Sequence, residues 1–170
     1  MKIMKTTLLS AMLFFVANTF AQSENIVGVA AGNENFTTLV TAVKAADLVG
    51  TLSSDGPFTV FAPVNAAFEA LPAGTVETLL KPESKDALTG ILTYHVVSGK
   101  YVAGDVIKAI EGNSGSFSVK TVQGGMITLT LSDGNVLLED EKGNSATVVM
   151  ADVAASNGVI HAIDAVVMPK

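Results

Sequence analysis

The apolar residues in the first half of the chain recur at the spacing of a helix with one buried face. Phe36, Leu39, Val40 and Val43 stand at positions i, i+3, i+4 and i+7, which predicts a helix capped by Asn35. Similar spacing predicts further short helices over residues 25–32, 48–52, 66–71, 75–80, 82–93 and 103–110. Strands are expected over 58–62 and 94–97.

The second half of the chain changes to short strands separated by turn residues. Apolar runs cover 117–122, 126–131, 136–139 and 147–150. The turns between them are Gly124-Gly125, Asp133-Gly134-Asn135 and Lys142-Gly143-Asn144, all of the kind found in hairpins. Helices followed by an antiparallel meander predict a single α+β domain.

The stretch near the C-terminus is apolar on both faces of a predicted strand. It opens with Asn157-Gly158, a turn pair in which both residues tolerate positive φ, and Pro169 is expected to end it. His161 lies on one face and Asp164 on the other. Such a strand is normally covered on both sides, so both polar side chains are expected to be buried and hydrogen bonded.

The first 21 residues have the pattern of a secretory signal peptide. Lys2 and Lys5 precede a short apolar run, and Thr19-Phe20-Ala21 supplies the small residues of a cleavage site after Ala21. The expected domains are a signal peptide over 1–21 and one domain over 22–170, secreted to the periplasm or the extracellular space. No integral membrane segment is expected after cleavage. The alternative is a retained N-terminal anchor, for which the apolar run is short.

The composition narrows the classes of function. All ten basic residues are lysines, and loss of Lys2 and Lys5 would change the formal net charge from −6 to −8. An acidic chain without arginine is a poor candidate for binding nucleic acid or anionic lipid. The chain has no cysteine, which excludes disulfides, a thiolate nucleophile and cysteine-ligated zinc.

Three sequence blocks occur in order along the chain and together resemble the fasciclin domain. They are Gly56-Pro57-Phe58-Thr59-Val60-Phe61-Ala62-Pro63-Val64-Asn65-Ala66-Ala67-Phe68, then Tyr94-His95-Val96-Val97, then Asn157-Gly158-Val159-Ile160-His161-Ala162-Ile163-Asp164. The resemblance covers about residues 25–169. It implies a wedge-shaped antiparallel β-sandwich with several helices packed against its N-terminal portion. The structural motif residues that it indicates are Thr59, Asn65, Asn157, Gly158, His161 and Asp164.

Little in the sequence indicates catalysis. His95 and His161 are the two histidines, and both lie in apolar runs, where an imidazole usually makes a buried hydrogen bond. Thr59 and Asn65 are the expected partners, and a catalytic or metal site with a nearby aspartate is the alternative. Glu139-Asp140-Glu141 is expected to be a solvated turn that protects strand edges, with calcium binding as the alternative. The sequence therefore predicts no catalytic residue, no metal and no cofactor, and a protein that is not an enzyme.

The family resemblance implies a binding function. In some animal members integrin recognition is attributed to an Asp-Ile pair and a Tyr-His segment, which correspond here to Asp152-Val153 and Tyr94-His95-Val96. The residues by themselves also allow Asp152 as a turn or cap, Tyr94 as a core residue and His95 as an internal brace. We expect an exported adhesion module that binds a cell-surface or matrix protein or polysaccharide, with its oligomeric state left open. The alternative is a small-ligand or lipid carrier with an apolar groove lined by Phe36, Phe68 and Met126.

Overall fold

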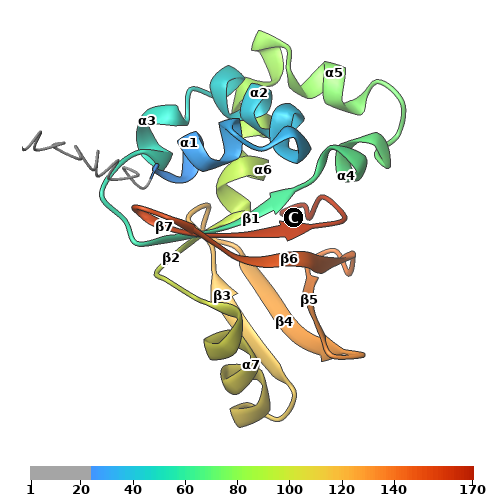
Figure 1. Ribbon diagram of the computed structural model, residues 1–170. Coiled ribbons are helices and arrows are strands. Elements are labelled where there is room, and N and C mark those ends of the chain that lie inside the picture. Colours follow the sequence, from blue (N-terminus) through green and yellow to red (C-terminus); the bar gives the residue numbers. More distant parts are fainter. Residues whose placement is uncertain (1–23) are drawn as a thin grey trace, which may run out of the picture.

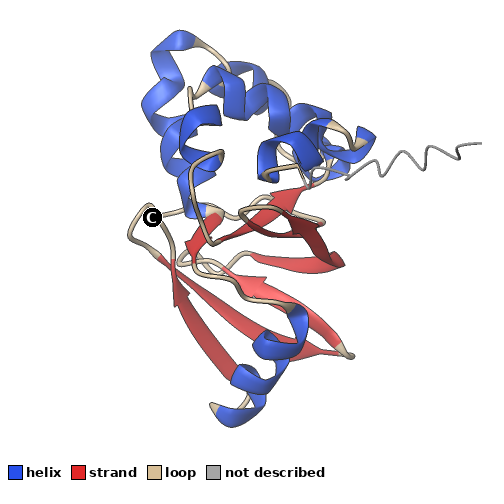
Figure 2. Cartoon of the chain, turned by 60° about the vertical axis from the view of Figure 1, so that its left-hand side comes forward, coloured by secondary structure: helices blue, strands red, loops and turns tan. Residues whose placement is uncertain are grey.

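A layer of helices covers one side of a mixed β-sheet in the computed structural model, which describes residues 24–170 (Figure 1). The signal peptide expected over 1–21 lies outside the described residues. Helix α7 (Ala103–Gly112) stands apart from the others and packs on β3 and β4 at the far end (Figure 2). The helical layer consists of α1 (Ile26–Ala31), the 3-10 helix η1 (Glu34–Phe36), α2 (Thr37–Ala45), α3 (Val49–Leu52), α4 (Asn65–Glu69), α5 (Thr75–Leu79), the 3-10 helix η2 (Pro82–Ser84) and α6 (Lys85–Tyr94).

Seven strands of the described residues form one sheet in the order β2-β1-β7-β6-β5-β4-β3. Strands β1 and β7 are parallel, so the sheet is mixed and not wholly antiparallel as expected. Strand β6 pairs with β5 through its first residues and with β7 through the rest, and a bridge between Val97 and Thr121 brings the two ends of the sheet together. The strands are β1 (Phe58–Pro63), β2 (Val96–Ser98), β3 (Ser116–Lys120), β4 (Met126–Ser132), β5 (Asn135–Glu139), β6 (Ser145–Ala155) and β7 (Gly158–Ile163).

Two apolar cores lie on opposite faces of β1 and β7. The first, between the helical layer and the sheet, includes Phe36, Val60 and Ile160. The second, between the sheet and α7, includes Phe61 and Ile163 from the opposite faces of the same strands. Every residue of β7 is buried, which confirms that this strand is covered on both sides. Full burial of a side chain the size of Phe36 stabilises the fold by roughly 1.5–3 kcal/mol.

Two strand predictions are wrong at one end each. Tyr94 and His95 are not in a strand, because the helical bonds of α6 continue to His95, whose N–H donates to the carbonyl of Ile91. The C-terminal strand ends at Ile163, well before Pro169. There Asp164 is exposed, not buried, and its Oδ1 accepts a hydrogen bond from the N–H of Thr147 at 2.7 Å.

Asparagine side chains cap helices in this fold, although not the ones expected. Asn35 caps nothing; Asn33 caps η1 by accepting from the N–H of Asn35. Asn65, the first residue of α4, accepts through its Oδ1 from the N–H of Thr38 at 3.1 Å at the start of α2. Its Nδ2 donates to the carbonyl of Glu34 at 2.8 Å. Asn65 therefore joins two helices that are about 30 residues apart in the chain.

The Asn157-Gly158 turn is held by close contacts and does not use the positive φ expected of it. Asn157 Oδ1 accepts from the N–H of Ile26 at 2.9 Å, and Nδ2 donates to the carbonyls of Leu52 and Ser54. A Cβ on Gly158 would lie 1.9 Å from the carbonyl oxygen of Phe58. Glycine is required here because the two parallel backbones approach too closely for any side chain.

Candidate binding surface

The predicted contact residues Tyr94, His95 and Val96 lie inside the molecule. Their exposed fractions are 0%, 2% and 4%. The Tyr94 hydroxyl donates to the carbonyl of Met126 at 2.6 Å and accepts from the N–H of Glu141 at 3.3 Å. Burial raises the pKa of Tyr94, as do the carboxylates of Glu141 and Asp140, so the hydroxyl stays a neutral donor. Direct contact between a partner and these three side chains would require the fold to open.

Both ring nitrogens of His95 are hydrogen bonded to the backbone. Nδ1 donates to the carbonyl of Ile91 at 2.7 Å, and Nε2 accepts from the N–H of Val167 at 3.2 Å. These partners fix one neutral tautomer and differ from the expected Thr59 and Asn65. Burial lowers the pKa of His95 to about 4, against smaller opposing effects of the Ile91 carbonyl and the Asp140 carboxylate. The ring is therefore uncharged at neutral pH.

The pKa of His95 predicts a loss of stability in mild acid. An imidazole that titrates near 6.5 when unfolded and near 4 when folded gives the unfolded chain more bound protons between these pH values. The free energy of unfolding should therefore fall by at most about 3 kcal/mol as the pH drops from 7 to 4. Urea unfolding at several pH values measures this slope. His95→Gln should flatten it, and an equally steep slope in that variant would contradict the assignment.

Asp140 is the centre of a buried turn and not a solvated residue as expected. It is 5% exposed, and its carboxylate accepts four hydrogen bonds from protein groups. Oδ1 accepts from the N–H groups of Lys142 and Asn144, and Oδ2 accepts from Asn144 Nδ2 and from the N–H of Met168. Burial alone would raise the pKa of Asp140, but these hydrogen bonds lower it below its ordinary value. The same bonds occupy the oxygens that a calcium ion would need.

Asp152 and His161 belong to a second side-chain network, at the start of α7. Asp152 lies within β6 and not in a loop, at φ 57°, and its Oδ1 accepts from the N–H of Ala103 at 2.8 Å. His161 Nδ1 accepts from the N–H of Asp152 at 3.3 Å, and Nε2 donates to the carbonyl of Tyr101 at 2.7 Å. Thr59 Oγ1 accepts from the N–H of Tyr101 at 2.9 Å. The exposed aspartate thus caps a helix and is fixed in position by a buried histidine.

Strand β6 carries two exposed large apolar side chains beside Asp152, and one of them, Val149, is the most exposed of its kind among the described residues. Its pairing with β7 is irregular between Val148 and Val153, where the register shifts twice. Val149 is 58% exposed and Met150 43%, and both Ala151 and Asp152 are exposed as well. We call residues 149–152 the β6 bulge. In a regular strand, successive side chains would alternate between core and solvent. The irregular register instead leaves four successive side chains exposed.

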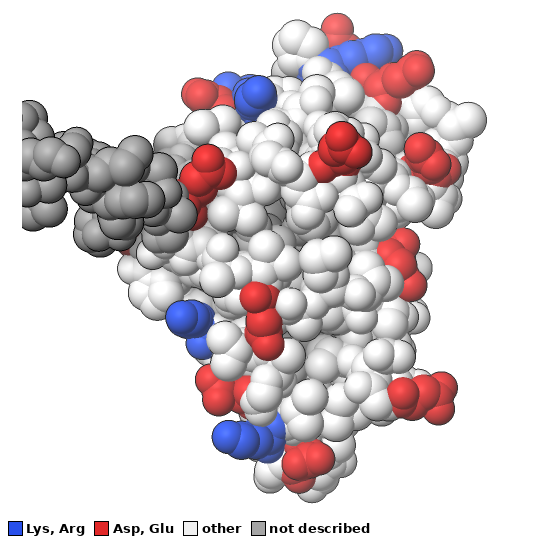
Figure 3. Space-filling view, in the orientation of Figure 1, with Lys and Arg blue, Asp and Glu red and all other residues white. Residues whose placement is uncertain are grey.

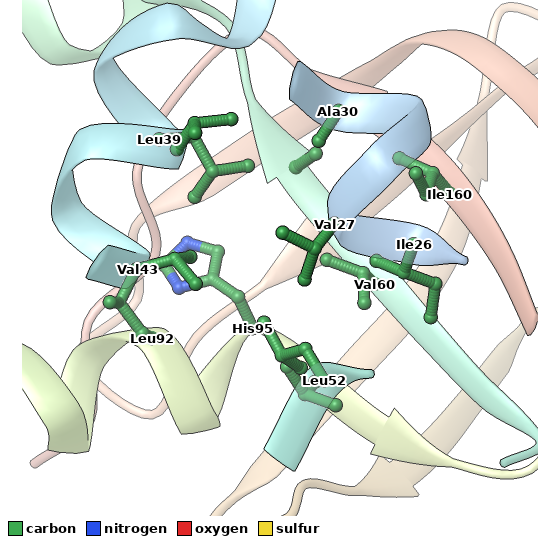
Figure 4. Close-up of a pocket in the computed structure, with 13 residues that line it drawn as sticks. Ile26, Val27, Ala30, Leu39, Val43, Leu52, Val60, Leu92, His95 and Ile160 are labelled. Atoms are coloured by element: carbon green, nitrogen blue, oxygen red, sulfur yellow. The ribbon is translucent and has the colours of Figure 1, made fainter. Parts of the chain in front are cut away.

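The cavity inside the helical core is small and apolar. Its walls come from α1, α2, α3, α6, β1, β2 and β7, and the His95 ring forms part of them (Figure 4). The volume of the cavity is about 20 Å³, far below the roughly 300–1,000 Å³ of typical ligand pockets. The expected carrier lining is also divided, because Phe36 and Phe68 belong to the helical core and Met126 is exposed on β4. The three residues predicted to line a carrier groove therefore do not line one common cavity.

Charged groups are dispersed over the surface. On the face seen in Figure 3, lysines do not gather into a basic patch, and acidic side chains stand over both halves of the molecule. Within residues 24–170, no cluster of three or more histidine, aspartate or glutamate side chains could hold a metal ion. No helix formed by these residues is long and apolar enough to cross a membrane.

Comparison with known proteins decides the family. Residues 34–169 match the Fasciclin domain family. The chain belongs to the fasciclin family. A FAS1 domain pair from the insect cell adhesion molecule Fasciclin I has a solved structure that matches with a TM-score of 0.72 at 20% identity. The match covers 84% of this chain and 50% of that one, and it confirms the α+β fasciclin fold.

Several relatives of this fasciclin domain come from bacteria. Protein sll1483 of Synechocystis sp. is 56% identical, over 98% of this chain and 84% of its own length. Immunogenic protein MPB70 of Mycobacterium bovis is 39% identical, over 90% of this chain and 74% of its own length. An animal relative is the transforming growth factor-beta-induced protein ig-h3 of Sus scrofa, which is 35% identical. That match covers 85% of this chain and only 19% of the length of ig-h3.

The sequence blocks of the fasciclin domain meet in two separate side-chain networks. Thr59 and His161, from the first and third blocks, share the network at the start of α7. Tyr94 and His95, from the second block, lie with Asp140 near residues 166–170 at the C-terminus. Asp140 lies outside all three blocks, and the sequence prediction missed it. The two parts of the predicted site, Asp152-Val153 and Tyr94-His95-Val96, thus belong to different networks.

Proposed function

We propose that this fasciclin domain is an exported, non-catalytic adhesion module that binds a cell-surface or matrix protein or polysaccharide through the β6 bulge. The observation that carries the proposal is the exposure of Val149 and Met150 directly beside Asp152. Exposed apolar residues next to a charged one are typical of a binding surface, where the apolar groups supply affinity and the polar group supplies orientation.

The supporting structure of the bulge favours a preformed contact. Asp152 is tied to Ala103 through its side chain and to His161 through its N–H, so the bulge is anchored at one end. A surface fixed in this way loses little conformational entropy when a partner binds. Val153, the other half of the predicted pair, is half-buried and packs against the helical core. We therefore assign the contact to Val149, Met150 and Asp152, with Val153 as a support.

A non-catalytic role agrees with the state of both histidines. Each ring uses both of its nitrogens in hydrogen bonds to backbone groups. A general base needs a free nitrogen within reach of a substrate. Fasciclin I is an insect cell adhesion molecule, and we extend a role in adhesion to this chain as part of the proposal.

The test is binding of the mature protein to an array of matrix proteins and glycans. The protein should be clustered on streptavidin through an N-terminal biotin, because a single small patch binds weakly and clustering raises the apparent affinity. The double variant Val149→Ser/Met150→Ser should lose about tenfold or more in apparent affinity, which corresponds to roughly 1.4 kcal/mol.

The matched control is Val122→Ser/Met126→Ser, which removes two other exposed apolar side chains, 44% and 41% exposed. This control should change binding less than about twofold. Equal losses in the two double variants would reject the β6 bulge as the contact. Absence of binding to every array member by the clustered wild type would reject the adhesion proposal.

A further inference from the structure

The C-terminal segment Val166–Lys170 is held by two titratable side chains. The segment forms no helix or strand. The N–H of Val167 donates to His95 Nε2 at 3.2 Å, and the next N–H, that of Met168, donates to Asp140 Oδ2 at 3.0 Å. Both views of the ribbon have the C-terminus at the border between the helical layer and the sheet (Figures 1 and 2).

Protonation disturbs the acceptor in each case. His95 Nδ1 already carries a proton for the carbonyl of Ile91, so a second proton must go to Nε2, where it would face the N–H of Val167. Protonation of Asp140 on Oδ2 adds an O–H to an oxygen that already accepts from Asn144 Nδ2 and the Met168 N–H, and it removes the negative charge that strengthens these bonds. The N–H of Val167 would then lose its acceptor, and the acceptor of the Met168 N–H would be weakened.

The segment also seals both cores. Val166 packs in the core beneath the helices, and Val167, which is 0% exposed, packs in the core beside α7. Release of these two residues would therefore open the border between the two halves of the molecule.

Few charged groups lie around the two acceptors, His95 Nε2 and Asp140 Oδ2. Asp140 is the charged group that acts on His95, and the cavity walls from α1, α2, α3, α6, β1, β2 and β7 around the ring are apolar. Asp140 and Glu141 act in turn on Tyr94, whose hydroxyl is buried against the same turn. No lysine makes an ion pair with Asp140 among the described residues. The proton equilibria of His95 and Asp140 are thus set by burial and by the bonds to the segment and its turn.

We propose that the C-terminal segment is an acid-sensitive latch, which opens when protonation of His95 removes the acceptor of the Val167 N–H and protonation of Asp140 weakens that of the Met168 N–H. His95 acts first, because Asp140 titrates only in stronger acid. If the open latch returns the imidazole to its ordinary pKa of 6.5, the ratio of open to closed molecules rises about 20-fold between pH 7 and pH 5. The function of this latch is to expose apolar surface at the border of the two cores in acid while the rest of the fold stays closed.

The test uses nuclear magnetic resonance on the uniformly ¹⁵N-labelled mature protein, titrated from pH 7 to pH 3.5. The heteronuclear NOE of the Val167 and Met168 amides should fall as the pH is lowered, and the midpoint should coincide with the titration of the His95 ring. The amide of Leu129, buried in β4, should keep its NOE over the same range because the sheet remains folded. His95→Gln, whose side chain keeps an amide donor and acceptor but does not titrate, should move the response of Val167 to lower pH.

The outcomes separate the latch from general acid unfolding. Loss of the Val167, Met168 and Leu129 signals at one common pH would overturn the proposal, because the whole domain would then be unfolding together. Constant NOE values for Val167 and Met168 through the His95 titration would also overturn it. Should His95→Gln fail to fold, agreement or disagreement between the ring and amide midpoints in the wild type still decides the question.

Discussion

Gly158→Ala should lower the free energy of unfolding by more than about 4 kcal/mol, an unusually large effect for one methyl group. The added Cβ would lie 1.9 Å from the carbonyl oxygen of Phe58, and 2.8 and 2.9 Å from the carbonyl carbon and nitrogen of the same residue. These are backbone atoms of the neighbouring parallel strand, so no side-chain rotation can relieve the overlap. The start of the β1–β7 pair would have to separate. Urea unfolding measures the loss directly.

Gly90→Ala is the matched control for this substitution. Gly90 lies inside α6, and a Cβ there would meet nothing within 4 Å. The same chemical change should therefore stabilise the protein by about 0.5–1 kcal/mol, the usual gain from alanine in a helix. If Gly158→Ala proves as stable as the wild type to within about 1 kcal/mol, the close approach of the two strands is incorrect.

The sequence predicts the elements of this fold well and their ends less well. The helical spacing from Phe36 to Val43 and the doubly apolar strand after Gly158 are local patterns, and the structure confirms both. The end of β7 lies beside a distant partner, which local patterns do not report. Asp164, for example, bends the chain because the N–H of Thr147, 17 residues away, binds its carboxylate.

The polar residues were the hardest to interpret from the sequence. Asn157 was expected in a turn because of its backbone preferences, yet its side chain binds Ile26, a residue 131 positions away. Nothing in the neighbouring sequence indicates such a partner. One hydrogen bond of Asp140 could be predicted from the neighbouring sequence. An aspartate that starts a tight turn often accepts a hydrogen bond from the N–H two residues later, which here belongs to Lys142. The hydrogen bond from the N–H of Met168, 28 residues away, could not be predicted in this way.

Asp140→Ala should lower the free energy of unfolding by about 4 kcal/mol, because four hydrogen bonds to a buried carboxylate are lost together. Two of the abandoned donors are backbone N–H groups of the turn, and a third belongs to Met168 in the C-terminal segment. The turn and the segment should therefore loosen together, and amide exchange at Asn144 and Met168 should accelerate in the same variant. Urea unfolding gives the energy, and hydrogen exchange gives the location.

Glu139→Ala is the control that separates a buried centre from a solvated acidic run. Glu139 is the neighbouring acid and is exposed at the end of β5, so its removal takes away the same charge. Its loss should change stability by no more than about 0.5 kcal/mol. Equal and small effects of the two substitutions would mean that the run is the solvated turn indicated by its composition. A large effect confined to Asp140 would mean that hydrogen-bond geometry, and not net charge, determines the role of this acidic turn.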